Sequence, residues 1–211
     1  MKVFDSLKKK AEESKKVIVF PEGNDDRIIK AAVRLEKEGI VKPLLLGKPD
    51  EVIKTAQSLN VDLGSIEIIN PAVYPDFEKM CQDFVELRKG KNTLAEAKEI
   101  LQDVSYFGTM LVYEGKADGM VSGATHSTAN TVRPALQIIK TKKGMSRVSG
   151  AMIMERGDEK YIFADCAINI DPNSETLAEI AYQSSKTAEM IGLEPKIAML
   201  SFSTKGSAKG P

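Results

Sequence analysis

The sequence predicts an α/β fold in which helices cover both faces of a parallel sheet. Between Val17 and Pro71, short apolar or β-branched runs alternate with segments whose apolar residues recur at helical spacing. Glycine, proline and asparagine separate these segments. Strands that alternate with helices pair in parallel and are covered on both sides. The composition of the 211 residues, 42% hydrophobic and 28% charged, is ordinary for a globular protein.

The pattern begins with a strand, a turn and a helix. Val17–Phe20 is a β-branched run that Pro21 ends. The turn Gly23–Asp26 offers two aspartates as helix N-caps. From Ile28 to Leu35 the apolar residues follow helical spacing, and Gly39 is a natural helix end.

The same alternation continues along the chain. A strand is expected at Val41–Leu46, a helix at Asp50–Leu59 and a strand at Ile66–Ile69. Two long helices are expected next, at Phe77–Lys89 and Leu94–Glu114, because apolar residues recur there at steps of three and four.

The centre of the chain predicts another strand and helix. Gly119–Gly123 has the character of a buried strand that leads into a loop. A helix is expected over Thr128–Ile139, with Pro134 near its start. The charged, glycine-ended connector Lys140–Gly144 follows, so we expect a domain boundary there.

This boundary divides the chain into a first α/β domain, residues 1–143, and the start of a second α/β domain, residues 144–211. The elements expected in the second part are strands at Val148–Met154 and Tyr161–Ala164, a helix at Ser174–Ile191 and a strand at Lys196–Ser201.

Charge and cysteine content exclude several classes of protein. Thirty basic residues balance thirty acidic ones, so the net charge is zero. A net charge of zero gives no electrostatic reason to expect binding to nucleic acids or membranes. Cys81 and Cys166 form no CxxC pair and His126 is the single histidine, so we expect no metal site. Lone cysteines, and apolar runs too short for a membrane span or signal peptide, favour a cytoplasmic protein.

The loop Ser122–Arg133 is the most informative stretch. It joins an expected strand to an expected helix, where ligands bind in open α/β folds. Its glycine and alanine residues allow close backbone approach, and its hydroxyls and the helix N-terminus offer donors to an anion. Arg133 can grip a phosphate or carboxylate through two hydrogen bonds. The alternative is an ordinary polar loop with helix caps.

His126, in this loop, is either a general acid or base or a histidine that makes structural or substrate contacts. The loop around Ser203, Thr204 and Lys205 also follows an expected strand and is rich in hydroxyls. It is not a P-loop, because Lys205 precedes its glycine, but it offers groups for a phosphate.

Each of four other residues has either a functional or a purely structural role. Arg88 ends an expected helix, where a positive charge is favourable in itself. Asp165 and Asn169 either bind a ligand or cap a turn. Cys166 is expected to be a small buried hydrophobic residue rather than a nucleophile.

Six motifs, in order along the chain, resemble those of one family. They are Val19-Phe20-Pro21-Glu22, Glu86-Leu87-Arg88, the run Asp118–Ser127, Thr131–Ala135, Phe163-Ala164-Asp165 and the run Met199–Ala208. Together they resemble the phosphate acetyl- and butyryltransferases. His126-Ser127, followed by Thr131-Val132-Arg133-Pro134, favours the acetyl-transferring members of that family.

The resemblance implies reversible acetyl transfer between coenzyme A and phosphate, through thiolate attack on acetyl phosphate in a ternary complex. Coenzyme A or acetyl-CoA and phosphate or acetyl phosphate would be the substrates, and no cofactor would be tightly bound. The family fold implies a three-layer sandwich in two domains, similar to isocitrate and isopropylmalate dehydrogenases. The active site would lie in the cleft between the two domains, and the enzyme would be a homodimer. It would act in acetate metabolism.

The resemblance also implies roles for residues of this sequence. Arg133 would bind the phosphate, with help from Ser127 and Thr131. Arg88 would contact coenzyme A or a phosphate. The remaining candidates for substrate binding are Ser122, Gly123, His126 and Thr128 in the first loop and Ser203, Thr204 and Lys205 in the second.

The family's catalytic serine and aspartate match no residue before Pro211, and Gly210 stands where the family usually has serine. The aspartate would take the thiol proton and the serine would support the transition state. The catalytic residues of this chain are therefore unknown, and we expect it to be a fragment that is inactive alone.

Three alternatives remain open. The chain resembles phosphate butyryltransferases less closely than the acetyl enzymes, but both belong to one family. A non-catalytic regulatory module would bind acyl-CoA without turnover. A nicotinamide-dependent dehydrogenase of similar fold is disfavoured, because the sequence lacks a GxGxxG turn.

Overall fold

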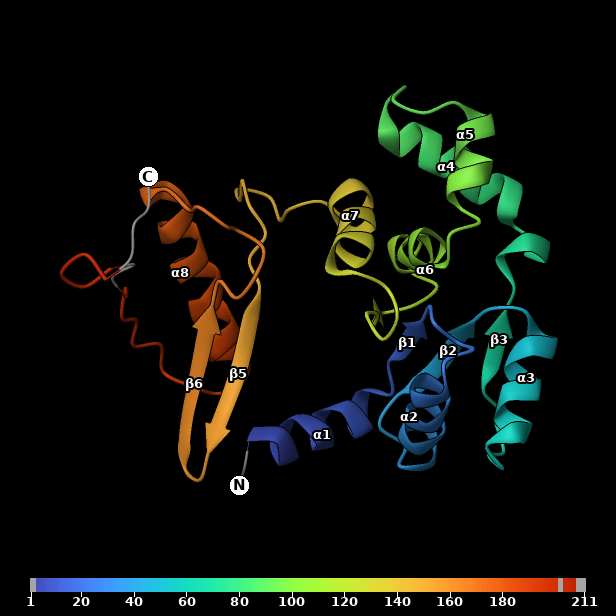
Figure 1. The fold of residues 1–211 in the computed structure, drawn as a ribbon, viewed down its shortest axis with the longest axis horizontal. Helices are drawn as coiled ribbons and strands as arrows, with labels where there is room; N and C mark the ends of the chain where they lie inside the picture. Colours follow the sequence, from blue (N-terminus) through green and yellow to red (C-terminus); the bar gives the residue numbers. More distant parts are fainter. Residues whose placement is uncertain (1–2, 201–202, 208–211) are drawn as a thin grey trace. The chain divides into compact units, whose positions relative to one another are not determined.

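The computed structural model describes residues 3–200 and 203–207 (Figure 1). The chain divides into two compact units, with the division between Lys140 and Thr141. The expected boundary between the two domains of the whole protein, at residues 143 and 144, stays a prediction. The first helix, α1 (Val3–Ser14), exposes Lys8, Lys9 and Lys10 to solvent.

The larger unit contains a four-stranded parallel sheet in the order β3-β2-β1-β4. Its strands are β1 (Val17–Phe20), β2 (Lys42–Leu46), β3 (Glu67–Ile69) and β4 (Gly119–Met120). Val19 lies between Leu44 of β2 and Met120 of β4 in the register. The strands therefore confirm the expected parallel α/β arrangement.

Helices cover both faces of this sheet, because alternate residues of β1 and β2 point to opposite sides. Phe20 and Leu45 pack in a cluster with Ile29 and Val52 of α2 (Asp26–Lys37) and α3 (Pro49–Ser58). Val19, Leu44 and Leu46 belong to the other cluster, formed with the helices that follow β3. The three layers of helix, sheet and helix are thus confirmed in this unit.

The helices of the second layer are α4 (Phe77–Arg88), α5 (Leu94–Ile100), α6 (Val104–Tyr113) and α7 (Thr128–Ile138), after the short 3-10 turn η1 (Pro71–Val73). The single helix expected over 94–114 is wrong. Asp103 ends it, because its carboxylate accepts hydrogen bonds from the N–H groups of Ser105 and Tyr106 and so caps α6. Pro134 lies in the middle of α7 rather than near its start.

The strand expected at 119–123 is shorter and less buried than its composition predicts. β4 contains only Gly119 and Met120, which are half-buried, and Val121 is 54% exposed. It lies at the edge of the sheet, so only β1 pairs with it among the described strands. The rest of the expected strand is already the loop that leads to α7.

The smaller unit contains the hairpin β5 (Ala151–Arg156) and β6 (Glu159–Ala164) and the helix α8 (Ser174–Met190). The two strands pair antiparallel, unlike the first sheet, because the short turn at Gly157 can only reverse the chain. The strand expected at 196–201 is wrong over 196–200, and Ser201 lies outside the described residues.

The turn after β1 depends on Gly23. Its N–H donates to the Leu46 carbonyl oxygen at 3.1 Å, and a Cβ at this position would lie 2.4 Å from that oxygen. We expect Gly23→Ala to reduce the free energy of unfolding by about 1–3 kcal/mol, because the backbone of β2 or of the turn must move. Denaturant unfolding measures this, with the exposed neighbour Asn24→Ala as control. Equal stability of the two variants would contradict the close packing of this turn.

Candidate functional site

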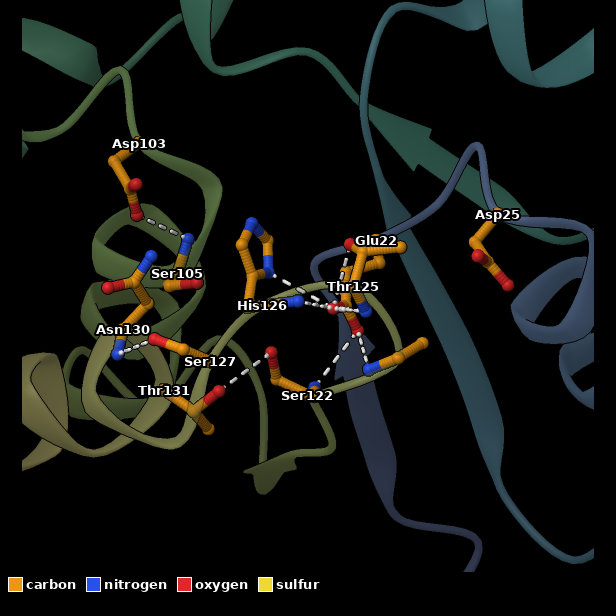
Figure 2. A network of polar contacts seen from close by, with 12 residues as sticks. Glu22, Asp25, Asp103, Ser105, Ser122, Thr125, His126, Ser127, Asn130 and Thr131 are labelled. Atoms are coloured by element: carbon orange, nitrogen blue, oxygen red, sulfur yellow. Dashed lines mark hydrogen bonds and ion pairs between the residues drawn. The ribbon is translucent and has the colours of Figure 1, made fainter.

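A buried carboxylate organises the loop between β4 and α7. Glu22, just after β1, has a side chain only 2% exposed. Its Oε2 accepts hydrogen bonds from the N–H groups of Gly123 at 3.0 Å and Ala124 at 2.9 Å. Its Oε1 accepts from the N–H groups of Thr125 at 2.6 Å and His126 at 2.7 Å, and from the Thr125 hydroxyl at 3.0 Å. Figure 2 shows the loop wrapped around this carboxylate.

The sheet explains how residues a hundred positions apart meet here. β1 and β4 are parallel neighbours, so the loops that leave their carboxyl ends lie at the same edge. A second link joins the same loops: the Arg27 guanidinium donates to the Ala124 carbonyl oxygen at 2.6 Å. At the other end of the strands, the Asp118 carboxylate accepts from the Val17 N–H.

The hydrogen bonds set the protonation state of Glu22. Burial raises the pKa of the carboxyl, but the bonds from the N–H groups of Thr125, His126 and Ala124 outweigh burial. The pKa is therefore lowered from 4.5 to about 2. Glu22 is an anion at neutral pH, and the loop is built around its charge.

This shift predicts a pH-dependent contribution to stability. A carboxyl with a lowered pKa in the folded state stabilises the protein above pH 4.5, and this contribution is lost as pH falls from 4.5 toward 2. We expect Glu22→Gln to reduce the free energy of unfolding by about 2 kcal/mol at pH 6, because its amide group faces N–H donors. Urea unfolding at pH 6 and pH 3 measures both proteins. If the difference in free energy of unfolding between wild type and Glu22→Gln is as large at pH 3 as at pH 6, this would contradict the lowered pKa of Glu22.

His126 lies beside the same carboxylate. Its Nδ1 is 3.2 Å from Glu22 Oε1, outside hydrogen-bond geometry, and its side chain is 23% exposed. Figure 2 shows the second ring nitrogen directed away from Glu22. The structure thus supplies the acidic neighbour that the surrounding sequence lacks.

The hydroxyl groups of the loop are partly engaged in structure. The Ser127 Oγ accepts from the Asn130 N–H at 3.2 Å and caps α7. The Thr131 hydroxyl donates to the Ser122 Oγ at 3.4 Å (Figure 2). Thr128 is the first residue of α7 and is exposed, whereas Ser122 is half-buried.

Arg133 leaves α7 on a different face from Thr131, because residues two apart on a helix are about 200° apart. Its guanidinium is exposed and makes no hydrogen bond or ion pair within the part of the chain that the structure describes. The Tyr106 hydroxyl donates to Gln137 Oε1 at 3.0 Å, one turn after Arg133. Arg88, at the end of α4, donates from Nε to Asn92 Oδ1 at 3.2 Å.

Both arginines act on Tyr106. Burial raises the pKa of its phenol, and the charges of Arg133 and, more weakly, Arg88 lower it, while Asp103 raises it. The charges of two guanidinium groups, one at the end of α4 and one in the middle of α7, thus act on one half-buried tyrosine near the start of α6. This arrangement can hold an anion with more than one negative charge.

The second candidate loop belongs to the smaller unit. Ser203 is half-buried, and Thr204 and Lys205 are exposed. The Thr204 N–H donates to the Ser207 Oγ at 3.2 Å, so part of this loop closes on itself.

Asp165 caps a turn, one of its two expected roles. Its carboxylate accepts from the N–H groups of Ala167, Ile168 and Asn169, at 2.9, 3.0 and 2.9 Å. The expectation that Cys166 is buried is wrong: it is exposed, because this turn leaves it outside the sheet. Its Sγ lies 3.0 Å from the Phe163 carbonyl oxygen.

The described residues contain no cluster of three histidine, cysteine or acidic side chains that could hold a metal ion. Within residues 3–200 and 203–207, every helix is too short or too polar to span a bilayer.

Sequence reasoning missed the role of Glu22. It identified the residue only as part of a family motif and treated the loop as a site for an external anion. In the structure, four N–H groups of the loop donate to Glu22 instead. The available signal was an acidic residue directly after a strand, at the sheet edge where the loop also begins.

Comparison with known families gives one clear result. The sequence profile of the family described as "Phosphate acetyl/butaryl transferase" matches residues 2–211. Phosphate acetyltransferase of Bacillus subtilis (strain 168) is 54% identical over 207 residues, which is 98% of this chain and 64% of the relative. Phosphate acetyltransferase of Staphylococcus aureus (strain MRSA252) is 58% identical over 192 residues, 91% of this chain and 58% of the relative.

Solved structures agree. EutD phosphotransacetylase from Staphylococcus aureus superposes with a TM-score of 0.89 at 55% identity, over 99% of this chain and 63% of that one. A phosphotransacetylase from Streptococcus pyogenes superposes with a TM-score of 0.91 at 56% identity, over 99% and 64%. The chain thus spans about three fifths of the length of these relatives.

Proposed function

Because this chain belongs to the phosphate acetyl/butyryl transferase family, we propose that it forms part of an enzyme that transfers an acetyl group reversibly between coenzyme A and phosphate. The relatives named phosphate acetyltransferase support the acetyl group over the butyryl group. Coenzyme A is a substrate in this proposal, and no tightly bound cofactor takes part.

The observation that carries the proposal is that two arginines without a carboxylate partner among the described residues both lower the pKa of the same phenol, that of Tyr106. Arg133 has no anionic partner among the described residues, and Arg88 donates there only to the neutral Asn92. Two such cations attract a dianionic phosphate, and a guanidinium binds it through two parallel hydrogen bonds. Arg133 therefore binds the phosphate of acetyl phosphate, and Arg88 contacts the same phosphate or one of coenzyme A.

The reaction needs charge stabilisation at the phosphate. The thiolate of coenzyme A attacks the acetyl carbon, a C–S bond forms, and the C–O bond to phosphate breaks. The phosphate leaves with the electron pair, and the thiol proton passes to a base. Arg133 stabilises the negative charge that gathers on the leaving phosphate. The base and the supporting serine are expected in a part of the family fold that matches nothing before Pro211.

The remaining expectations complete the proposal. Ser127, Thr131 and His126 line the phosphate side of the site, together with Ser122, Gly123 and Thr128. Ser203, Thr204 and Lys205 contribute a phosphate or coenzyme A contact. The enzyme works in the cytoplasm as a homodimer with a cleft between two domains, similar to isocitrate and isopropylmalate dehydrogenases.

The test is thioester formation from acetyl phosphate and coenzyme A. We expect a chain of the relatives' length to form acetyl-CoA, and to use acetyl phosphate faster than butyryl phosphate. The 211-residue chain is expected to be inactive, and activity of this chain would place the base within it.

The rival functions predict other outcomes in the same assay. Binding of acetyl-CoA without turnover by the longer chain would favour a regulatory module. Binding of a nicotinamide cofactor with no thioester formed would favour a dehydrogenase.

A further inference from the structure

The loop Gly123–His126 has the geometry of an anion-binding turn. The N–H groups of four consecutive residues converge on two oxygen atoms. Converging N–H groups of this kind commonly bind phosphate. Here the anion is internal, because the Glu22 carboxylate already accepts from all four.

This occupancy restricts how a substrate can bind. A phosphate at the four N–H groups would have to displace a buried carboxylate that also accepts from the Thr125 hydroxyl. Leaving that charge buried without partners is costly. The phosphate is therefore left to side chains, and the loop serves to hold them.

The carboxylate also sets the state of the His126 ring. Nδ1 lies 3.2 Å from Glu22 Oε1 but outside hydrogen-bond geometry, so the carboxylate acts on it through its charge, which repels a lone pair on Nδ1 and attracts a proton there. A neutral ring with its proton on Nδ1 has an unprotonated Nε2, which points away from Glu22 (Figure 2). A carboxylate behind one nitrogen of a histidine fixes the use of the other nitrogen.

We propose that Glu22 is a positioning residue, which holds the loop Gly123–His126 and the Nδ1-protonated His126 ring so that Nε2 faces the substrate phosphate. The phosphate as the ligand rests on the proposed function. The hold of Glu22 on the His126 ring does not depend on it.

The ring state is measured first. His126 is the single histidine of the 211 residues, so ¹⁵N-histidine labelling gives two ring signals with no assignment problem. At a pH where the ring is neutral, we expect the wild-type Nδ1 to carry the proton. In Glu22→Gln the population with the proton on Nε2 is expected to rise severalfold. A wild-type ring protonated on Nε2 would overturn the proposal, whether or not the enzyme is active.

Kinetics of a chain of the relatives' length then separate positioning from folding. We expect Glu22→Gln to raise the KM for acetyl phosphate at least tenfold and the KM for coenzyme A less than twofold. Thr125→Val is the matched control, because it removes one hydroxyl bond to Glu22 and keeps the four N–H bonds. Its KM for acetyl phosphate is expected to rise less than threefold.

Other outcomes are equally informative. A fall in kcat with both KM values unchanged would mean a smaller folded fraction and would overturn the positioning role. Tighter phosphate binding by Glu22→Gln would also overturn it, because the freed N–H groups would then be the phosphate site. If Glu22→Gln does not fold, the wild-type ring signals decide the question. Absence of thioester formation by the wild type, with the ring protonated on Nδ1, would reject the proposed function alone.

Discussion

Replacing Arg133 with alanine is expected to reduce kcat/KM for acetyl phosphate at least tenfold, which is about 1.4 kcal/mol of transition-state stabilisation. Its guanidinium is exposed on α7 and unpaired among the described residues, so the change is expected to cost little stability and to test the proposed contact to the phosphate. Arg133→Lys keeps the charge and loses the paired donors, so its activity is expected to lie between wild type and Arg133→Ala.

The measurement is steady-state thioester formation by a chain of the relatives' length, with acetyl phosphate varied. Arg34→Ala is the matched control, because Arg34 is also an exposed helical arginine, on α2, but it pairs with Glu38, which follows that helix. Its kcat/KM is expected to remain within twofold of wild type. Unchanged kinetics in Arg133→Ala would remove Arg133 from the phosphate site.

Replacing Phe84 with alanine is expected to reduce the free energy of unfolding by about 3–5 kcal/mol. Phe84 is fully buried in α4, in the cluster on one face of the sheet. Its ring lies edge-on to Tyr106, with ring centroids 6.3 Å apart. The change leaves a cavity beneath the tyrosine that both arginines act on, so a folded variant is expected to lose phosphate affinity as well.

Urea unfolding of the 211-residue chain measures this loss of stability. Val73→Ala is the control, because Val73 is 75% exposed and its replacement is expected to cost less than about 0.5 kcal/mol. If Phe84→Ala and Val73→Ala have the same free energy of unfolding, this result would contradict the burial of Phe84 between α4 and α6.

Local patterns predicted most of the elements because their causes are local. Val17, Ile18 and Val19 are β-branched, and β1 has the expected bounds Val17–Phe20. The aspartates of the first turn predict a cap, and the Asp25 side chain accepts from the Arg27 N–H at 2.9 Å. The helix expected over 94–114 was wrong because its periodicity continues across Asp103, whose capping bonds stop the helix.

The position of the candidate site could be predicted from the sequence, but the hydrogen-bond partners of its residues could not. A loop between a strand and a helix lies at the ligand edge of a parallel sheet, and its sequence marks Arg133 and His126. The partner of that loop, Glu22, is distant in the chain. Its selection depends on β1 being the neighbour of β4, which periodicity does not specify.

The sequence by itself determined the family, the parallel α/β class and the residues able to bind an anion, because these depend on local pattern and residue type. Only the tertiary structure decided which of them have partners. It gave the loop N–H groups to Glu22, directed Thr131 toward Ser122, and left Arg133 without a partner among the described residues. The physical reason is that strand order and helix packing bring distant groups together, and a buried charge takes the nearest donors.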